Sequence, residues 1–365
     1  MRRLSKYQAP GELAAGERAW SLVQAAFEAR EPVAWPRRHA RPLVAGALVA
    51  AVVVAVLSPP GRSVVHSLRK AVGIEKAQPA LFSLPTRGQL LVTSPSGAWL
   101  VRPDGSKRLL GRYRDAAFSP SGLFVVATRA NELAALDPKG TEIVRWALAR
   151  PNPRFPAWTG TRTDTRIAYL SGGRVRVVAG DGTGDRVLAR AAPVAPVWRP
   201  GPTRVLTYST GRAVVVEDVE ARAVLLRLRP GAAPTRLAWS DDGRRLLVFT
   251  RRGLLAFDRS GRLVLRRGAV AAAFAPGTHR LAAIRVHGAQ SDVFQARSGR
   301  LLFRGTGVFR QLAWSPNGRW LLITWPTANQ WVFLRTRPRK IVASARISAQ
   351  FDGFPRVAGW CCGAR

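Results

Sequence analysis

Short apolar runs separated by turn residues recur along most of this chain. The stretch "LAWSPNGRWLLITW" (312–325) is one example, with an aromatic residue, a Ser-Pro-Asn-Gly turn and a second apolar run. Ser, Pro, Asn and Gly suit successive positions of a tight turn, and short apolar runs bounded by such turns are typical of β-strands. Similar stretches begin near residues 116, 156, 196, 237 and 272. The recurrence indicates architecture rather than a unique chemical site.

The aromatic residues that anchor these stretches follow one another at intervals of 35 to 46 residues. About twenty residues after most anchors, an apolar run leads into an Asp and Gly turn, as in "AALDPKGTEIV" and "LAFDRSGRLVL". Four antiparallel strands at a period near forty residues predict β-propeller blades, with each anchor packed between neighbouring blades. The anchors are Phe118, Trp158, Trp198, Trp239, Phe274, Trp314 and Trp360.

The two ends of the repeat region complement each other. Residues 89–111 contain "QLLVTS" and the hairpin "AWLVRPDGSKRLLG", but no anchored strand precedes them. Residues 356–362, "RVAGWCC", contain an anchored strand but no hairpin after it. We therefore predict that the strand of Trp360 completes one blade with residues 89–111. The fold would be all-β, a seven-bladed β-propeller over residues 89–362, and a six-bladed ring with an irregular end is the alternative.

An apolar segment without charges covers residues 42–58, and Pro59-Pro60-Gly61 ends it. Its length and its Ala/Val composition predict a transmembrane helix, in preference to a cleaved signal peptide or a buried core helix. Arg37, Arg38 and Arg41 crowd its front edge, which favours a cytoplasmic N-terminus and an extracytoplasmic propeller. Residues 59–88 would form a juxtamembrane stem or linker.

Residues 1–41 form the predicted cytoplasmic tail. Within it, apolar side chains of Leu13, Trp20, Val23 and Phe27 recur at helical spacing, which predicts an amphipathic helix over residues 12–30. Such a helix would lie on the membrane surface or bind a cytoplasmic protein.

The charge is strongly positive, with 58 Lys and Arg residues against 21 Asp and Glu, and 52 of the basic residues are Arg. This excess indicates an anionic partner or an Arg-rich coding composition. The arginines are spread through predicted turns and strand faces rather than gathered in a stripe, so no nucleic-acid interface is expected. Lipid headgroups or an anionic envelope polymer would supply the counter-charge.

No pattern of catalytic residues emerges, so we expect neither an enzyme nor a bound cofactor. The Gly-x-Ser-x-Gly motif of propeller-gated peptidases is missing, and the Asp of each hairpin already has a role in its turn. His279 and His287 are one strand apart, but two lone histidines rarely form a metal site. Cys361 and Cys362 are adjacent, which makes them a candidate vicinal disulfide.

The repeats resemble the TolB-type, WD-like propeller repeat of bacterial envelope proteins. The resemblance is carried by "AWSPNGRWLLITW", "AWSDDGRRLLVF", "AFSPSGLFVVA" and the hairpin "VVAGDGTGDRVL", and it covers about residues 89–362. The second and third units depart from it, with "WTGTRTDTR" and "WRPGPTR" in place of the turn, and the Gly-His and Trp-Asp signatures of WD repeats are missing.

The resemblance implies binding of proteins or peptides. We therefore expect a membrane-anchored, extracytoplasmic platform for a protein or polymer of the cell envelope. The alternative is a transmembrane signalling protein that relays propeller binding to the 12–30 helix. Its layout is similar to that of anti-sigma factors, although the zinc-binding Cys of that family is missing from the tail.

Overall fold

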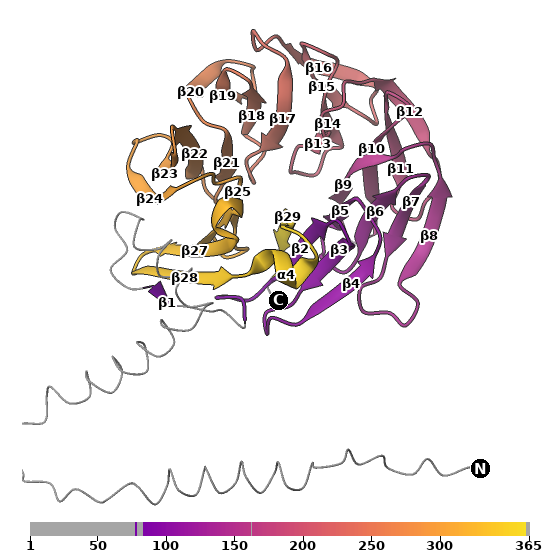
Figure 1. Ribbon diagram of the computed structural model, residues 1–365. Helices are drawn as coiled ribbons and strands as arrows, with labels where there is room; N and C mark the ends of the chain where they lie inside the picture. Colours follow the sequence, from indigo (N-terminus) through magenta and orange to yellow (C-terminus); the bar gives the residue numbers. More distant parts are fainter. Residues whose placement is uncertain (1–76, 79–82, 162, 363–365) are drawn as a thin grey trace, which may run out of the picture. The chain divides into compact units, whose positions relative to one another are not determined.

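The structure, a computed structural model, describes residues 77–78, 83–161 and 163–362. In them the chain forms seven β-sheets placed round a common centre (Figure 1). Each sheet is one propeller blade, and the blades are numbered I to VII from the first hairpin in the chain. The seven-bladed prediction is confirmed.

The strands of each blade are given from the centre of the ring outward. Blade I contains β29 (Arg356–Cys361), β2 (Gln89–Ser94), β3 (Gly97–Val101) and β4 (Lys107–Gly111). Blade II contains β5 (Asp115–Phe118), β6 (Val125–Arg129), β7 (Glu132–Leu136) and β8 (Val144–Ala149). Blade III contains β9 (Arg154–Gly160), β10 (Thr165–Ser171), β11 (Arg174–Ala179) and β12 (Arg186–Arg190). Blade IV contains β13 (Val197–Trp198), β14 (Val205–Ser209), β15 (Val214–Asp218) and β16 (Ala223–Leu228).

Blades V to VII continue the same order. Blade V contains β17 (Pro234–Trp239), β18 (Arg245–Thr250), β19 (Gly253–Asp258) and β20 (Leu263–Arg267). Blade VI contains β21 (Ala271–Phe274), β22 (Leu281–His287), β23 (Gln290–Gln295) and β24 (Leu301–Thr306). Blade VII contains β25 (Gln311–Trp314), β26 (Trp320–Trp325), β27 (Gln330–Thr336) and β28 (Arg339–Ala345), with β1 (Ala77–Gln78) paired in parallel to the outer edge of β28.

Several expectations concern residues outside this part of the chain. The tail over 1–41, its 12–30 helix and the 42–58 span all lie outside the described residues. Among the residues that are described, no helix is both long and apolar enough to span a bilayer. The predicted stem, 59–88, is described in part, and it contributes β1 to blade VII.

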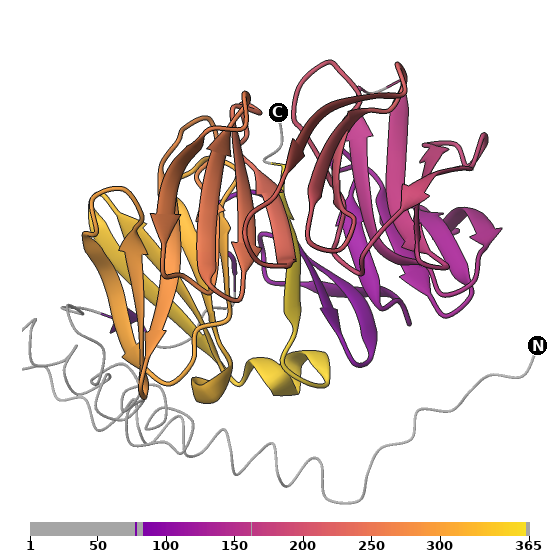
Figure 2. The same cartoon turned by 90° about the horizontal axis from the view of Figure 1, so that it is seen from above.

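The alternation of strand directions gives the ring two distinct faces. The innermost strand of each blade begins on the face that Figure 1 shows toward the viewer, here named the front face, and ends on the back face. The helix α4 (Ile347–Phe351) lies on the front face, and Figure 2 shows β29, in yellow, running from the side of this helix through the depth of the ring. A short 3-10 helix, η1 (Pro326–Ala328), joins β26 to β27. Each link from one blade to the next therefore crosses the front face.

Turn chemistry on the back face follows the sequence closely. In blade VII the hydroxyl Oγ of Ser315 accepts a hydrogen bond from the Trp320 N–H at 3.0 Å and donates one to Asn317 Oδ1 at 2.7 Å. The Gly318 N–H donates to the Ser315 carbonyl at 2.8 Å. Gly318 has φ of 63°, a left-handed conformation that glycine adopts without steric cost. The Ser-Pro-Asn-Gly stretch is thus a strand-connecting turn.

The ring closes by pairing the last strand with the first hairpin. Strand β29 pairs antiparallel with β2, and the register places Trp360 opposite Leu90 and Gly359 opposite Leu91. Leu90 and Leu91 are fully buried by this pairing. The composite blade predicted from the two chain ends is therefore confirmed, and the six-bladed alternative is wrong.

A chain truncated after Pro355 tests how much of the stability depends on this closure. It loses β29, which exposes the inner edge of β2 and the side chains of Leu90 and Leu91. Each buried Leu contributes about 1.5–3 kcal/mol, so we expect the free energy of unfolding to fall by several kcal/mol and the transition to broaden. Urea unfolding followed by tryptophan fluorescence measures this effect. A chain ending at Cys362 is the control, and equal stability of the two chains would contradict the prediction.

Candidate functional site

The seven anchoring aromatics all lie on innermost strands, where each packs against the core of the preceding blade. Phe118 contacts the cluster of blade I around Leu91, and Trp158 contacts that of blade II around Val126. Trp360 completes the ring, because its indole lies edge-on to Phe333 of blade VII with ring centroids 5.7 Å apart. The other four anchors each pack in the same way into the apolar cluster that they share with the preceding blade. They are Trp198, Trp239, Phe274 and Trp314.

Three of the indole N–H groups also donate hydrogen bonds to the preceding blade. Trp198 Nε1 donates to the carbonyl of Ala157 at 3.0 Å, and Trp314 Nε1 donates to that of Ala273 at 3.0 Å. Trp239 Nε1 donates to the hydroxyl of Thr207 at 2.9 Å. These contacts join adjacent blades through a buried surface. The indole N–H groups of Trp158 and Trp360 are buried without a hydrogen-bond partner among the described residues.

Cys361 and Cys362 are joined in a disulfide at the back-face end of β29. A Cβ added to Gly122 would overlap the Sγ of Cys362, so the pair rests on the turn that follows β5 of blade II. The disulfide therefore lies where the two ends of the propeller meet.

The buried carboxylates are held in ion pairs between strands. Asp292 is fully buried, and Arg304 donates to it through Nε at 2.5 Å and Nη2 at 2.9 Å. The hydrogen bonds from Arg304 hold the pKa of Asp292 below its ordinary value. His287 Nε2 lies 3.3 Å from the same carboxylate, and His279 Nε2 lies 2.6 Å from Asp242 Oδ2. The two histidines thus have separate partners.

Blades III and IV contain similar pairs. Tyr169 donates to Asp185 at 2.7 Å, and burial raises the pKa of Tyr169 to about 12. Tyr208 donates to the buried carboxylate of Glu217 at 2.6 Å. Among the residues that the structure describes, no group of three or more His, Cys, Asp or Glu side chains is arranged to hold a metal ion.

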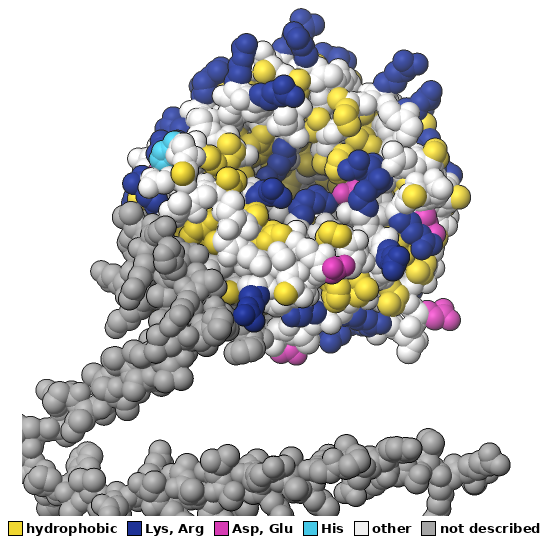
Figure 3. Space-filling view, viewed as in Figure 1, with side chains coloured by type: hydrophobic (Ala, Val, Ile, Leu, Met, Phe, Trp, Pro, Cys, Tyr) yellow, Lys and Arg dark blue, Asp and Glu magenta, His cyan; other side chains and the backbone are white. Residues whose placement is uncertain are grey.

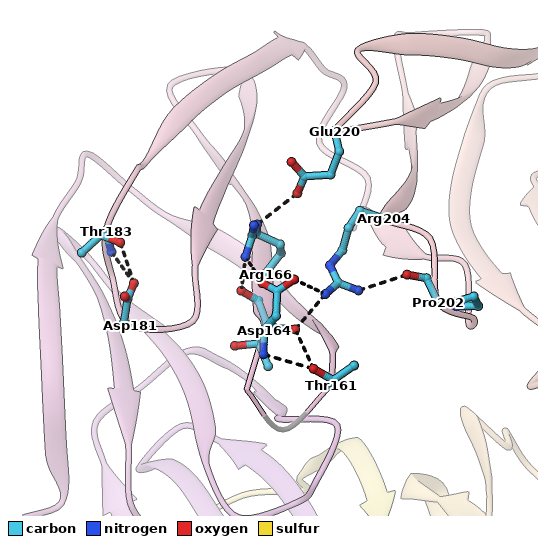
Figure 4. Close-up of polar contacts among 9 residues, drawn as sticks. Thr161, Asp164, Arg166, Asp181, Thr183, Pro202, Arg204 and Glu220 are labelled. Atoms are coloured by element: carbon cyan, nitrogen blue, oxygen red, sulfur yellow. Dashed lines mark hydrogen bonds and ion pairs between the residues drawn. The ribbon is translucent and has the colours of Figure 1, made fainter.

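A balanced charge network lies on the back face between blades III and IV (Figure 4). Arg204 Nη2 donates to Asp164 Oδ2 at 2.7 Å, and Arg166 Nε donates to Glu220 Oε1 at 3.1 Å. The hydrogen bond from Arg204 lowers the pKa of Asp164. Two guanidinium groups face two carboxylates here, so the network has no net charge. It links the two blades and offers no excess charge to a further ion.

The front face differs, because arginine recurs there at one register. The residue four places before the anchoring aromatic is Arg in blades VII, I, II and III, which are consecutive round the ring. The corresponding residues of blades IV, V and VI are Val194, Thr235 and Val270. Figure 3 shows Lys and Arg side chains around the central hollow of this face. This set is named the arginine crescent, and its members are Arg310, Arg356, Arg114 and Arg154.

One carboxylate, that of Asp115, organises three of these arginines. Arg356 Nη2 donates to Asp115 Oδ1 at 2.8 Å, and the Nε atoms of Arg154 and Arg114 lie 3.5 Å and 3.8 Å from Oδ2. Asp115 is only 4% exposed, whereas the arginine side chains are 40–47% exposed. In the described part of the chain, no other carboxylate comes within 4.0 Å of the crescent. Arg114 Nη2 also donates to Asn152 Oδ1 and to the Pro153 carbonyl, each at 2.9 Å. The buried anion and these contacts therefore hold the guanidinium groups in place while the side chains remain partly exposed.

Arg236 adds a fifth positive charge from blade V. Its Nη2 donates to the carbonyl of Ala272 at 3.3 Å, and its guanidinium lies 5.0 Å from the ring centroid of Phe249. Burial lowers the pKa of Arg236, and the positive charge of Arg356 lowers it further. Within the described ranges it has no carboxylate partner, although a guanidinium remains charged at neutral pH. The Arg236 side chain is half-buried.

Two pockets flank the Asp115 cluster on this face. One, of about 390 Å³, lies at the front edge of blade I beside the link to blade II, with Arg114, Arg356 and Tyr113 in its wall. The other, of about 350 Å³, lies at the front edge of blade III beside Arg154, between the link from blade II and the link to blade IV, and is lined largely by apolar residues. The apolar lining includes Pro151, Phe155, Leu170, Ala191 and Pro193. A ligand bound at the cluster would therefore have a pocket on either side.

The sequence-based view of dispersed arginines is wrong for this face. Arg114 and Arg356 are far apart in the chain, and closure of the ring brings both to Asp115. A signal was present in the sequence, because aligning the repeats on their aromatics places Arg at one position in four units. Which units are neighbours, and which face that position occupies, follow only from the closed ring.

Comparison with known proteins supports the fold. No protein-family model and no curated protein sequence matches this chain. The C-terminal WD40 domain of Sif2 is similar with a TM-score of 0.54 and 12% identity, covering 72% of this chain and 84% of that one. The Cps50 (Swd1) β-propeller domain of Myceliophteria thermophila gives 0.53 and 13%, covering 71% and 97%. Hsv2 of Kluyvelomyces marxianus gives 0.50 and 12%, covering 70% and 93%. The chain thus has a WD40-type, seven-bladed propeller fold.

The lowered pKa of Asp292 predicts a pH-dependent contribution to stability. A carboxyl group with a lower pKa in the folded state stabilises the fold above its unfolded pKa of about 3.9, and this contribution is lost as the pH falls through the folded value. Asp292→Asn should therefore be less stable than the native chain at neutral pH, and the difference should shrink below about pH 4. Urea unfolding across this range measures it, and a difference independent of pH would contradict the assignment.

Asp115→Asn tests the carboxylate that pairs with three arginines of the crescent. It leaves Arg356, Arg154 and Arg114 without a counter-charge, so we expect a loss of about 1–3 kcal/mol in the free energy of unfolding. Added salt should reduce the loss, because it screens repulsion between the arginines. Asp104→Asn, in an exposed turn where Asn can still accept the Ser106 N–H bond, is the matched control. Equal losses in the two variants would show that Asp115 has no special role.

Proposed function

We propose that this chain is a single-pass membrane protein whose propeller lies outside the cytoplasm and acts as a binding platform for a protein or an anionic polymer of the cell envelope. In this proposal residues 42–58 cross the membrane, residues 1–41 remain in the cytoplasm, and the resemblance to TolB-type repeats reflects a shared place in the envelope. The observation that carries the binding role is the arginine crescent on the front face.

Three features of the crescent support a binding role. The ring closes on itself, so the crescent is mounted on a rigid scaffold and would bind without a large loss of conformational entropy. Three of the four guanidinium groups share the one carboxylate of Asp115, so the crescent has an excess of positive charge, which favours an anionic ligand. The flanking pockets are of about the size, roughly 300–1,000 Å³, typical of ligand sites.

The platform is proposed to bind without catalysis. Glycosidase-type chemistry requires two carboxylates facing one cleft, each with a proton to give or take. Asp292, Asp185 and Glu217 are instead engaged by arginine or tyrosine side chains, and the crescent contains Asp115 alone. These carboxylates serve as structural counter-charges.

The topology is tested by fusing a phosphatase that is active only outside the cytoplasm after residue 80. Positively charged residues before the 42–58 segment favour retention of the N-terminus inside, so the fusion should be enzymatically active. A second fusion at the same residue carries a reporter that is active only in the cytoplasm, and it should be silent. The reverse pattern from two well-expressed fusions would overturn the membrane topology.

A further inference from the structure

The front face carries positive charge that the carboxylates of the described residues balance only in part. Arg236 has no carboxylate within 4.0 Å among the described residues, and its charge is desolvated by its surroundings. Arg310, in the crescent, makes no side-chain hydrogen bond or ion pair within that same part of the chain and is exposed. An anion placed near Arg236 would supply the counter-charge that its hydrogen bond to the Ala272 carbonyl and its contact with the Phe249 ring do not provide.

The donor geometry of the crescent suits carboxylate groups. Each guanidinium carries five N–H donors in a planar fork, and the 2.8 Å bond from Arg356 to Asp115 shows that this fork reaches a carboxylate here. Arg154 is held close by, because its guanidinium lies 4.7 Å from the ring of Phe155. A second carboxylate could therefore approach the solvent side of the same arginines, with Asp115 keeping them apart and oriented.

The apolar pocket beside Arg154 favours an anionic ligand that also carries an apolar group. Its wall contains Phe155, Leu170 and Pro193, and a Cβ added to Gly172 or Gly173 at its rim would meet nothing within 4 Å. The rim is therefore open backbone, and the interior would exclude water if a bulky apolar group filled it. A phosphate-rich or sugar-phosphate chain has no group for such a pocket, whereas a peptide offers apolar and acidic side chains side by side.

We propose that the arginine crescent binds an acidic peptide segment of a partner protein, with Asp or Glu carboxylates at the arginines and an adjacent aromatic or large aliphatic side chain in the apolar pocket at the front edge of blade III. This inference rests on the proposed binding role and narrows it to one class of ligand. The peptide would lie along the crescent, from the front-face end of β25 across β29 and β5 to β9, with the Asp115 cluster beneath it.

The test uses the full chain in detergent micelles and fluorescent, terminally blocked peptides. The probe is Glu-Glu-Phe-Glu-Glu, compared with Glu-Glu-Ser-Glu-Glu, which lacks the apolar group, and Gln-Gln-Phe-Gln-Gln, which lacks the charge. Fluorescence anisotropy gives each Kd. We expect the first peptide to bind about tenfold or more tightly than either of the others, since each lacks one of the two proposed contacts. Inorganic polyphosphate serves as the competitor that carries charge alone.

Two protein variants separate the crescent from general positive charge. Arg310→Gln removes a crescent charge, and Arg319→Gln removes an exposed charge from the turn at the opposite end of the same strand β25. Neither side chain makes a hydrogen bond or ion pair within the described residues, so neither variant should perturb folding. We expect Arg310→Gln to weaken the first peptide about three- to tenfold and Arg319→Gln to have no measurable effect.

Each outcome bears on the proposal. Equal effects of the two arginine variants would overturn the crescent as the site. Equal affinity for the Phe and Ser peptides, or stronger binding of polyphosphate than of the Phe peptide, would overturn the acidic-peptide assignment. Failure of every peptide, together with cross-linking of the full chain to an envelope component in its native membrane, would reject this ligand class while leaving the platform function intact. Failure of both would reject the two proposals together.

Discussion

The antiparallel pairing of β29 with β2 is the interaction on which the remainder of the structure depends. Without it, β2 would present an unpaired edge and the buried side chains of Leu90 and Leu91 to solvent. With it, blade I is complete and each blade has a neighbour on both sides. The chain brings together residues that are more than 260 positions apart to make this contact. Closure is therefore a long-range event that no local segment can stabilise alone.

Closure also explains why the aromatic anchors are effective. An isolated four-stranded sheet has two apolar faces and cannot bury both, whereas a ring of sheets buries each face against the next blade. Trp198 and Trp314 add hydrogen bonds to backbone carbonyls of the preceding blade, so the packing is directional as well as apolar. The same contact is repeated round the ring and ends with Trp360 against Phe333. The result is a rigid frame whose front-face loops are held in fixed positions.

The arginine crescent is a consequence of that frame. Arg356 belongs to the last strand and Arg114 to the loop before β5, yet both reach Asp115 because blade I is shared by the two ends of the propeller. The back-face network of Asp164, Arg166, Arg204 and Glu220 has matched charges and joins two blades. The front face instead combines a single buried carboxylate with several partly exposed guanidinium groups. The back-face network is therefore balanced in charge, whereas the front face carries an excess of positive charge.

The sequence by itself determined the blade. Apolar alternation, Ser-Pro-x-Gly and Asp-Gly turns, and a period near forty residues are local properties, and strand and turn formation follow from local backbone preferences. The chain ends also predicted the shared blade. One end has a hairpin without an anchored strand and the other has an anchored strand without a hairpin, so pairing the two completes one blade. Only the tertiary structure decided which side chains meet on the front face. Arg310, Arg356, Arg114 and Arg154 occupy one register in the repeat, but their proximity depends on ring order and strand direction, and their net charge depends on a single neighbour, Asp115. Distances between side chains of different blades are set by how the sheets pack, and no local pattern encodes them.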